Sequence, residues 1–182
     1  DKRKDDYPSL RSRANGELKN INQKEDKVFR KAACDKWIDV RAFGQVFAFK
    51  GKDGEEDSSG VSIGIRGPVS IHPAFSVTPV LDRISSIQIT KSVSGEGDGT
   101  KKASDTMGMK HRVDHGVYVF YGSINPQLAE ITGFSEEDAM KIKESLRTLF
   151  RNDASSARPE GSMEVYKLYW WEHNNLTGQF PS

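Results

Sequence analysis

The sequence predicts an α+β fold, in which helices pack on one face of a sheet. The carboxyl-terminal half has the order strand, helix, strand, and a further helix and strands precede it. A length of 182 residues suffices for one compact domain with a core but is short for two. Hydrophobic residues make up 35% of the chain and charged residues 29%, which indicates a folded domain that carries long polar segments.

The amino-terminal region is expected to contain one helix. Residues 1–31 are charged and show little apolar periodicity, so we expect a mobile excursion there. In residues 32–49 four apolar residues recur at helical spacing: Trp37, Val40, Phe43 and Phe47. This spacing predicts an amphipathic helix, whose far half is weakened by Gly44 and whose end, residues 46–49, has the composition of a strand.

The middle of the chain predicts short strands and loops. Residues 50–60 form a polar loop, and residues 61–65 and 84–91 alternate as strands do. Between these strands, residues 69–80 favour an irregular or edge strand because of three prolines: Pro68, Pro73 and Pro79. Residues 93–108 are rich in Gly and Ser and predict a protruding hairpin or flexible loop.

The last third predicts strand, helix and strand. Residues 113–124 have the pattern of a buried strand, and residues 163–171 are rich in Val, Tyr and Trp and predict a closing strand. Ser135 is expected to cap the helix between them, with acidic residues in its first turn. Four residues form its predicted buried stripe: Met140, Ile142, Leu146 and Leu149.

Charge and cysteine usage narrow the class of protein. Residues 1–36 carry 11 Lys and Arg against 7 Asp and Glu, whereas residues 128–182 carry 6 against 9. This asymmetry favours a protein that binds a polyanion through its basic part and another protein through its acidic part. The alternative is a solvated surface of mixed charge. The single Cys34 cannot form an internal disulfide, and no apolar run is long enough to span a bilayer. We therefore expect a soluble, cytoplasmic protein that does not contact membranes.

No pattern in the sequence predicts a reaction class, a metal or a cofactor. The Gly-rich residues 94–100 lack the spacing of a phosphate-binding loop. His111, Asp114 and His115 are a candidate metal site, but in a strand His111 and His115 would lie about 13 Å apart, too far to share one metal ion. The protein is therefore predicted not to be an enzyme.

A basic cluster with two methionines is the strongest candidate for a binding site. Its members are Lys101, Lys102, Lys110, His111 and Arg112, around Met107 and Met109. The basic side chains are predicted to contact a phosphate backbone and the methionines to wedge against bases, unless the methionines anchor the loop to the core. Arg66, flanked by Gly64 and Gly67, either contacts a phosphate or is a structural residue of an edge strand.

Five sequence blocks, which span the chain from about Cys34 to Gln179, resemble one family. They are Asp39-Val-Arg-Ala-Phe-Gly-Gln-Val-Phe47, Gly64-Ile-Arg-Gly-Pro-Val-Ser-Ile-His72, Ser104-Asp-Thr-Met-Gly-Met-Lys-His-Arg112, Asn152-Asp-Ala-Ser-Ser-Ala-Arg-Pro-Glu-Gly161 and Tyr169-Trp-Trp-Glu-His173. The family they resemble is the Cas-seven backbone subunit of type I-C CRISPR Cascade, also called the Csd-two type.

The resemblance implies an RNA-recognition-like (ferredoxin-like) fold in a single domain, residues 1–182. Its palm would be residues 32–91 and 109–182, with a finger-like insertion at 1–31 and a thumb-like loop at 92–108. Members of the family begin with a strand and an Asn-Pro-Asn-Gly-Asp loop that this sequence does not contain, so we expect a palm without its first strand.

The resemblance also implies a non-catalytic function in antiviral defence. Copies of the protein would polymerise as a filament along crRNA and present it for pairing with target DNA. Its other partners would be further Cascade subunits: Cas-five and the large and small subunits. One alternative is an RNA-cleaving subunit of the type III kind that uses Asp105, and another is a scaffold that contacts only protein.

Overall fold

The computed structural model describes residues 7, 9–22, 25–49, 61–91, 106–155 and 158–178, with the backbone alone described at 49, 61, 89–91, 106 and 107. The chain divides into two compact units. The first comprises Asp1–Ile71, Gly122–Ala154 and Glu160–Ser182, and the second comprises His72–Tyr121 and Ser155–Pro159. The division of the chain into palm, finger and thumb stays a prediction.

Three helices open the first unit: α1 (Leu10–Glu17), α2 (Asp26–Lys36) and α3 (Ile38–Phe43). Ser9 caps α1, because its hydroxyl accepts from the Ser12 N–H and the Ser12 hydroxyl accepts from the Ser9 N–H. The prediction of a mobile excursion is therefore wrong for the described part of residues 1–31. Ala14, Leu18 and Phe29 are buried there, and three apolar side chains so widely spaced leave no periodic signal in the sequence.

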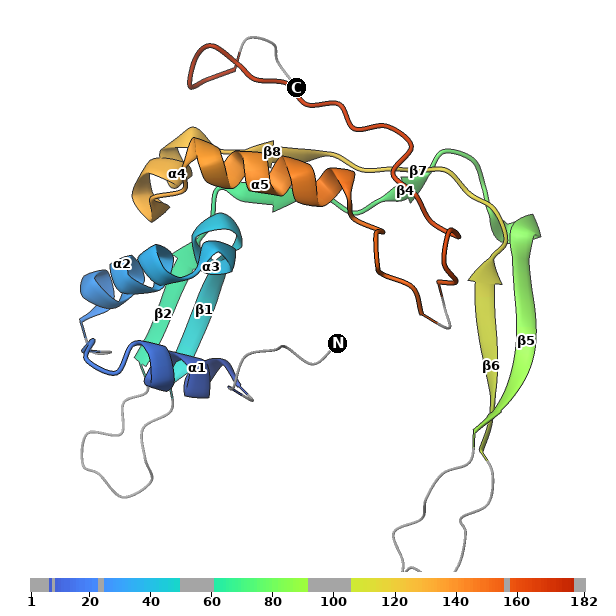
Figure 1. The fold of residues 1–182 in the computed structure, drawn as a ribbon, viewed down its shortest axis with the longest axis horizontal. Helices are drawn as coiled ribbons and strands as arrows, with labels where there is room; N and C mark the ends of the chain where they lie inside the picture. The colour runs from blue at the N-terminus through green and yellow to red at the C-terminus, as the bar shows by residue number, and fades with distance from the viewer. Residues whose placement is uncertain are drawn as a thin grey trace, which may run out of the picture. The chain divides into compact units, whose positions relative to one another are not determined.

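The helix predicted over residues 32–49 is broken twice. Trp37 has extended backbone angles and separates α2 from α3, and Gly44 ends α3 with a positive φ of 79°. The chain then continues as β1 (Gly44–Phe49), which pairs antiparallel with β2 (Val61–Arg66) (Figure 1). The strand expected over residues 61–65 is confirmed.

The β1–β2 ribbon carries the first core cluster on one face. Phe47 and Ile63 are cross-strand partners and both are fully buried. The Phe47 ring packs edge-on against Phe29, with ring centroids 5.1 Å apart, and stacks on Trp37 at 6.0 Å. Burial of these large rings fastens α1, α2 and α3 to the ribbon by the hydrophobic effect.

A second core cluster lies in the same unit, between β3 (Val69–Ile71), its antiparallel partner β8 (Gly122–Ile124), and the helices α4 (Pro126–Thr132) and α5 (Glu136–Arg147). Its buried residues are Ala42, Val69 and Phe134. The predicted cap of α5 is confirmed, since the Ser135 hydroxyl accepts from the Asp138 N–H. The predicted stripe is only half right, because Ile142 and Leu146 are half-buried while Met140 and Leu149 are exposed.

In the described residues, the second unit consists of two narrow antiparallel ribbons. β4 (Phe75–Ser76) pairs with β7 (Tyr118–Val119), and β5 (Ile84–Lys91), which follows the 3-10 turn η1 (Leu81–Arg83), pairs with β6 (Thr106–Val113) (Figure 1). The strand at 84–91 and the interrupted strand at 69–80 are confirmed. Every side chain described in this unit is at least partly exposed, and so are those of residues 122–124 in the first unit, so the expected buried strand at 113–124 is wrong. The stretch is interrupted at residues 114–117 and at 120–121, and within it Ile124 packs against the second core cluster.

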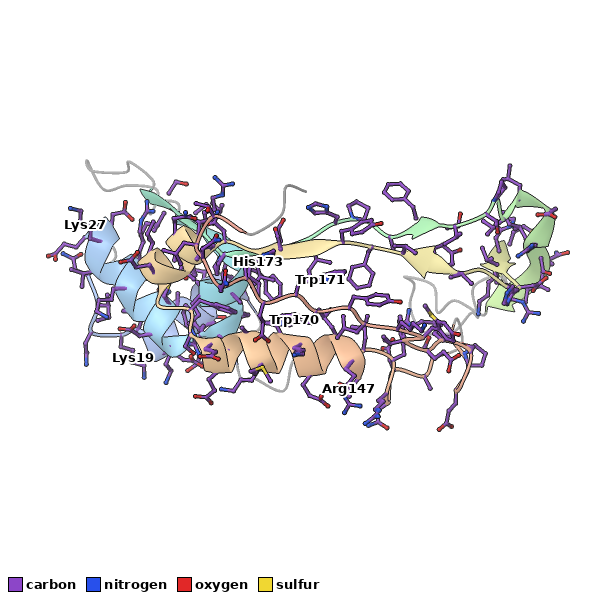
Figure 2. All side chains as sticks on the ribbon, turned by 90° about the horizontal axis from the view of Figure 1, so that it is seen from above. Lys19, Lys27, Arg147, Trp170, Trp171 and His173 are labelled. Atoms are coloured by element: carbon purple, nitrogen blue, oxygen red, sulfur yellow. The ribbon has the colours of Figure 1, made fainter. Side chains whose placement is uncertain are left out.

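The predicted closing strand at 163–171 is also wrong. The described residues 158–178 contain no helix or strand. Side chains contact α5 instead: the Lys143 ammonium lies 5.4 Å from the centroid of the Trp170 ring and 3.6 Å from the Glu172 carboxylate. Trp170, Trp171 and His173 of this segment are labelled in Figure 2. Tyr169 and Trp171 stack on each other with centroids 5.8 Å apart. The expected α+β class is confirmed, and each sheet in the described residues has two strands.

Candidate nucleic-acid interface

The β5–β6 ribbon carries the described part of the predicted basic cluster, and its register sorts the cluster onto two faces. Paired residues of an antiparallel ribbon share a face, and successive pairs alternate between faces. Ser85 pairs with Arg112 and Ile87 pairs with Lys110, so these four residues share one face, here called the basic face. Among the residues whose side chains are described, the other face, here called the methionine face, carries three pairs: Ile84 with Val113, Ser86 with His111, and Gln88 with Met109.

Arg112 is held by a small network at the base of the ribbon. Its Nε donates to Oδ1 of Asp114 at 2.9 Å, and the Ser85 hydroxyl donates to Oδ2 of the same carboxylate. The Asp114 N–H donates to the Arg83 carbonyl at 2.8 Å, which continues the ladder by one pair. The hydrogen bonds from Ser85 and Arg112 lower the pKa of Asp114 below its ordinary value, so its carboxylate is charged at neutral pH.

Sequence patterns alone did not link Ser85 and Asp114 to Arg112. Ser85 precedes Arg112 by 27 positions, and only the strand register brings the two together. Asp114, one of the candidate metal ligands, instead accepts hydrogen bonds from an arginine and a serine in the structure. An acidic residue two positions after an arginine at the end of a predicted strand is the one local signal that points to this pair.

The methionine face is open to solvent. Met109 has 58% of its surface exposed, so the alternative in which it anchors a loop to the core is wrong. Met109 also lies in a strand rather than in a loop, and the backbone of residue 107 belongs to the same strand. His111 Nδ1 lies 2.6 Å from the Ser86 hydroxyl, across the ribbon. Lys101, Lys102, Asp105 and the side chain of Met107 lie outside the described part of the structure.

Arg66 belongs to the other compact unit. It ends β2, opposite Gly44, on the exposed face of the β1–β2 ribbon. The two glycines beside it differ in their surroundings. A Cβ on Gly67 would lie 2.3 Å from the Ala42 carbonyl oxygen, whereas a Cβ on Gly64 would have nothing within 4 Å. Gly67 is therefore required by the packing of α3, and only Gly64 leaves open space beside Arg66.

A search with protein-family models matches residues 2–182 to the family described as CRISPR-associated protein Cas7. The chain belongs to the Cas7 family. CRISPR-associated protein Cas7 of Haloferax volcanii is 26% identical over 152 residues, which cover 79% of this chain and 44% of the relative. The chain thus spans less than half the length of the curated Cas7 relative that it matches. The Cas7 family, predicted from the five sequence blocks, is confirmed, whereas the type I-C (Csd-two) subtype stays a prediction.

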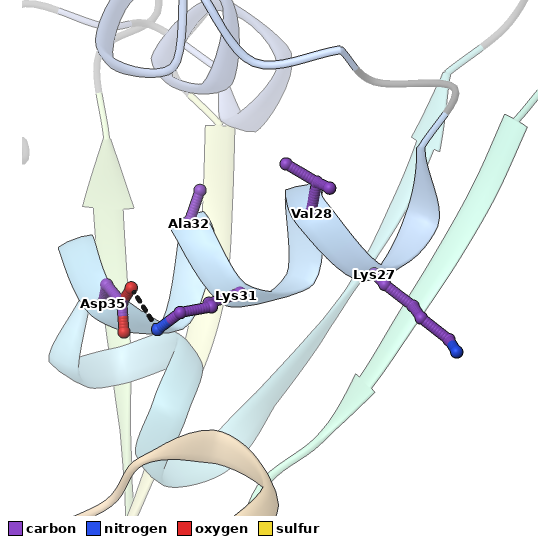
Figure 3. A pocket seen from close by; sticks show the side chains of 5 residues that line it. All are labelled: Lys27, Val28, Lys31, Ala32 and Asp35. Carbon is purple, nitrogen blue, oxygen red and sulfur yellow. Dashed lines mark hydrogen bonds and ion pairs between the residues drawn. The ribbon is translucent and has the colours of Figure 1, made fainter.

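Three other features concern the described residues of this Cas7 chain: metal ligands, membrane-spanning helices and a surface hollow. No three His, Cys, Asp or Glu side chains in the described ranges are placed to hold one metal ion, and no described helix is long and apolar enough to cross a membrane. A hollow of about 410 Å³ lies along α2. Its lining is Lys27, Val28, Lys31, Ala32 and Asp35, with Lys31 and Asp35 paired at 2.9 Å (Figure 3). All five come from one helix, so the hollow is an open surface.

Proposed function

We propose that this chain acts as a non-catalytic crRNA-binding backbone subunit of a type I-C CRISPR Cascade. In this function, copies of the protein polymerise along the guide RNA and present it for pairing with target DNA, together with the other Cascade subunits. Membership of the Cas7 family supports the proposal. The single structural observation that carries it is the basic face of the β5–β6 ribbon. None of the described side chains in the unit that contains this ribbon is buried.

The basic face suits a phosphate backbone for two reasons. Lys110 and Arg112 are alternate residues of one strand, so their Cα atoms lie about 6.6 Å apart and their side chains leave the ribbon in the same direction. The side chain of Arg112 is 64% exposed, which lets its guanidinium reach a ligand without disturbing the core. Cations placed in this way bind phosphates by displacing condensed counterions, irrespective of base sequence.

The methionine face suits bases better than phosphates. Met109 is an exposed, flexible apolar side chain, and sequence-tolerant recognition of single strands relies on side chains that pack against bases. Because the two faces point in opposite directions, we propose that phosphates meet Lys110 and Arg112 while bases meet Met109. The RNA-recognition-like palm, the finger-like residues 1–31 and the thumb-like residues 92–108 belong to the same proposal. The cleaving alternative rests on Asp105, outside the described residues, and no observation favours it.

The salt dependence of RNA binding tests the proposal. Replacement of Lys101, Lys102, Lys110 and Arg112 by Ala should weaken binding to all single-stranded sequences alike. Each lost phosphate contact reduces the slope of log K against log salt by ~0.7, so the fourfold variant should flatten the slope by roughly 3, and Lys110→Ala with Arg112→Ala by about 1.4.

A matched control removes two cations from the acidic last third of the chain. Lys141→Ala with Arg151→Ala changes the net charge as much as the ribbon pair does, and should leave the slope unaltered. Equal slopes for wild type, ribbon variants and control would show that the ribbon does not contact phosphates.

A further inference from the structure

We propose that Asp114 is a positioning residue for RNA binding, which holds Arg112 so that its two terminal nitrogens point at one phosphate group. This inference rests on the proposed function, because it assumes that the ribbon contacts RNA. It adds a role for an acidic residue inside a basic site, where charge alone would count against nucleic-acid binding.

The geometry around Asp114 leaves part of the arginine available. Asp114 engages Arg112 through Nε only, at 2.9 Å. Among the described residues, neither Nη nitrogen of Arg112 has a hydrogen-bond partner, and a guanidinium with a free Nη pair can still take a phosphate at two points. Ser85 binds the second carboxylate oxygen, so both oxygens of Asp114 are in use and its orientation is set by the neighbouring strand.

Orientation matters because an exposed arginine otherwise samples many rotamers. Binding a phosphate with an unrestrained arginine costs side-chain entropy of about 0.5–1.5 kcal/mol, which corresponds to about 2- to 12-fold in affinity. In the free protein the Arg112 side chain is already restrained, because it is bound to Asp114. Asp114 is itself fixed, since its backbone N–H donates to the Arg83 carbonyl and its carboxylate accepts from Ser85. Removal of the carboxylate would release the guanidinium.

Charge alone predicts that Asp114→Asn strengthens RNA binding, whereas a positioning role predicts that it weakens binding. Asp114 is negative, and removal of one exposed negative charge beside a polyanion should strengthen binding by about 1.4- to 5-fold, the scale of an exposed ion pair. Asp82 provides the matched control: it is an exposed aspartate in the turn before β5, and it has no ion pair among the described residues. Asp82→Asn and Asp114→Asn change the net charge equally, so a difference in affinity between the two variants does not come from net charge.

The experiment measures the affinity of the full chain for a labelled single-stranded oligouridylate, with thermal unfolding of each variant alongside. We expect Asp114→Asn to weaken binding by about 2- to 12-fold and Asp82→Asn to leave it unchanged or slightly stronger. Ser85→Ala, which keeps the net charge, should weaken binding in the same direction as Asp114→Asn, and Ser85→Thr should restore it because the hydroxyl returns.

A double-mutant cycle with Arg112 separates positioning from a general effect on the ribbon. In an Arg112→Ala background, Asp114→Asn should no longer weaken binding, because there is no guanidinium to hold. A further loss in that background would show that Asp114 only supports the ribbon, and tighter binding by Asp114→Asn alone would show that it is only a repelling charge. Either result overturns the inference while leaving RNA binding intact. If Lys110→Ala and Arg112→Ala have no effect, the ribbon site itself fails and the inference fails with it.

Discussion

At the scale of single residues, Arg41 and Asp138 show how one ion pair joins three helices. Arg41 donates from Nε and Nη2 to the two carboxylate oxygens of Asp138, at 2.7 and 2.8 Å, and from Nη1 to the Cys34 carbonyl at 3.2 Å. Asp138 also accepts from the Ser135 N–H at the start of α5. The Asp138 side chain is only 3% exposed, so loss of its partner would leave a buried charge.

The pH dependence of unfolding tests this ion pair. The hydrogen bond from Arg41 lowers the pKa of Asp138 to about 2 from an ordinary 3.8, even though burial acts against it. A lowered pKa gives stability that is fully present above pH 3.8 and is lost as the pH falls towards 2, by about 2 kcal/mol in total. In urea unfolding, wild type should lose most of this contribution between pH 5 and pH 2.5, whereas Asp138→Asn should lack the contribution at both pH values.

The same substitution should also destabilise the protein at neutral pH. Removal of one partner of a buried ion pair costs roughly 3–5 kcal/mol. Glu137→Gln is the control, because the Glu137–Lys141 pair one position earlier is exposed and should contribute at most about 0.5 kcal/mol. Equal stabilities for the two variants would contradict the structural role of Asp138.

At the scale of elements, the corner between α3, β1 and β2 depends on backbone contact at Gly67. A Cβ at this position would meet three backbone atoms: the Ala42 oxygen at 2.3 Å, the Phe43 carbon at 2.4 Å and the Gly44 nitrogen at 2.5 Å. Backbone cannot move aside as a flexible side chain can, so Gly67→Ala should destabilise the protein by about 1–3 kcal/mol.

Gly64→Ala is the matched control for this prediction. Its Cβ would meet nothing within 4 Å, and an alanine that fits its site restricts the unfolded chain, which stabilises by about 0.4–1 kcal/mol. Thermal unfolding of the two variants should therefore shift in opposite directions. A fall of similar size in both would show that the corner does not depend on the close approach at Gly67.

Elements with a local signal could be predicted from the sequence, whereas burial could not. Ser135 and the acidic first turn predicted the start of α5, and alternation predicted the strands at 61–65 and 84–91. Residues 113–124 and 163–171 carry an equally clear apolar pattern, yet their burial depends on neighbours that the pattern does not specify. In the site, Lys110 and Arg112 were predicted from charge, but their separation from Met109 follows from strand register alone.

At the scale of the whole molecule, the two units differ in what stabilises them. The first unit contains both core clusters, built around Phe47 and Ile63 in one and Val69 and Phe134 in the other. In the second unit, no described side chain is buried, and a two-stranded ribbon alone is marginally stable in water. The proposed RNA contacts at Lys110 and Arg112 therefore lie on the unit that is less stabilised by buried side chains.

Hydrogen exchange of backbone amides tests this division. Local opening costs little free energy where few apolar contacts are buried, so amides of β5 and β6 should exchange quickly, while those of α2, β1 and β2 should exchange slowly. A single-stranded RNA that binds the ribbon should slow exchange in β5 and β6 and leave β1 and β2 unchanged, because a ligand stabilises the state to which it binds. Arg112→Ala should reduce that protection at the same RNA concentration. Uniform slow exchange across both units in the free protein would contradict the difference in stability, and protection by RNA confined to the first unit would contradict the proposed site.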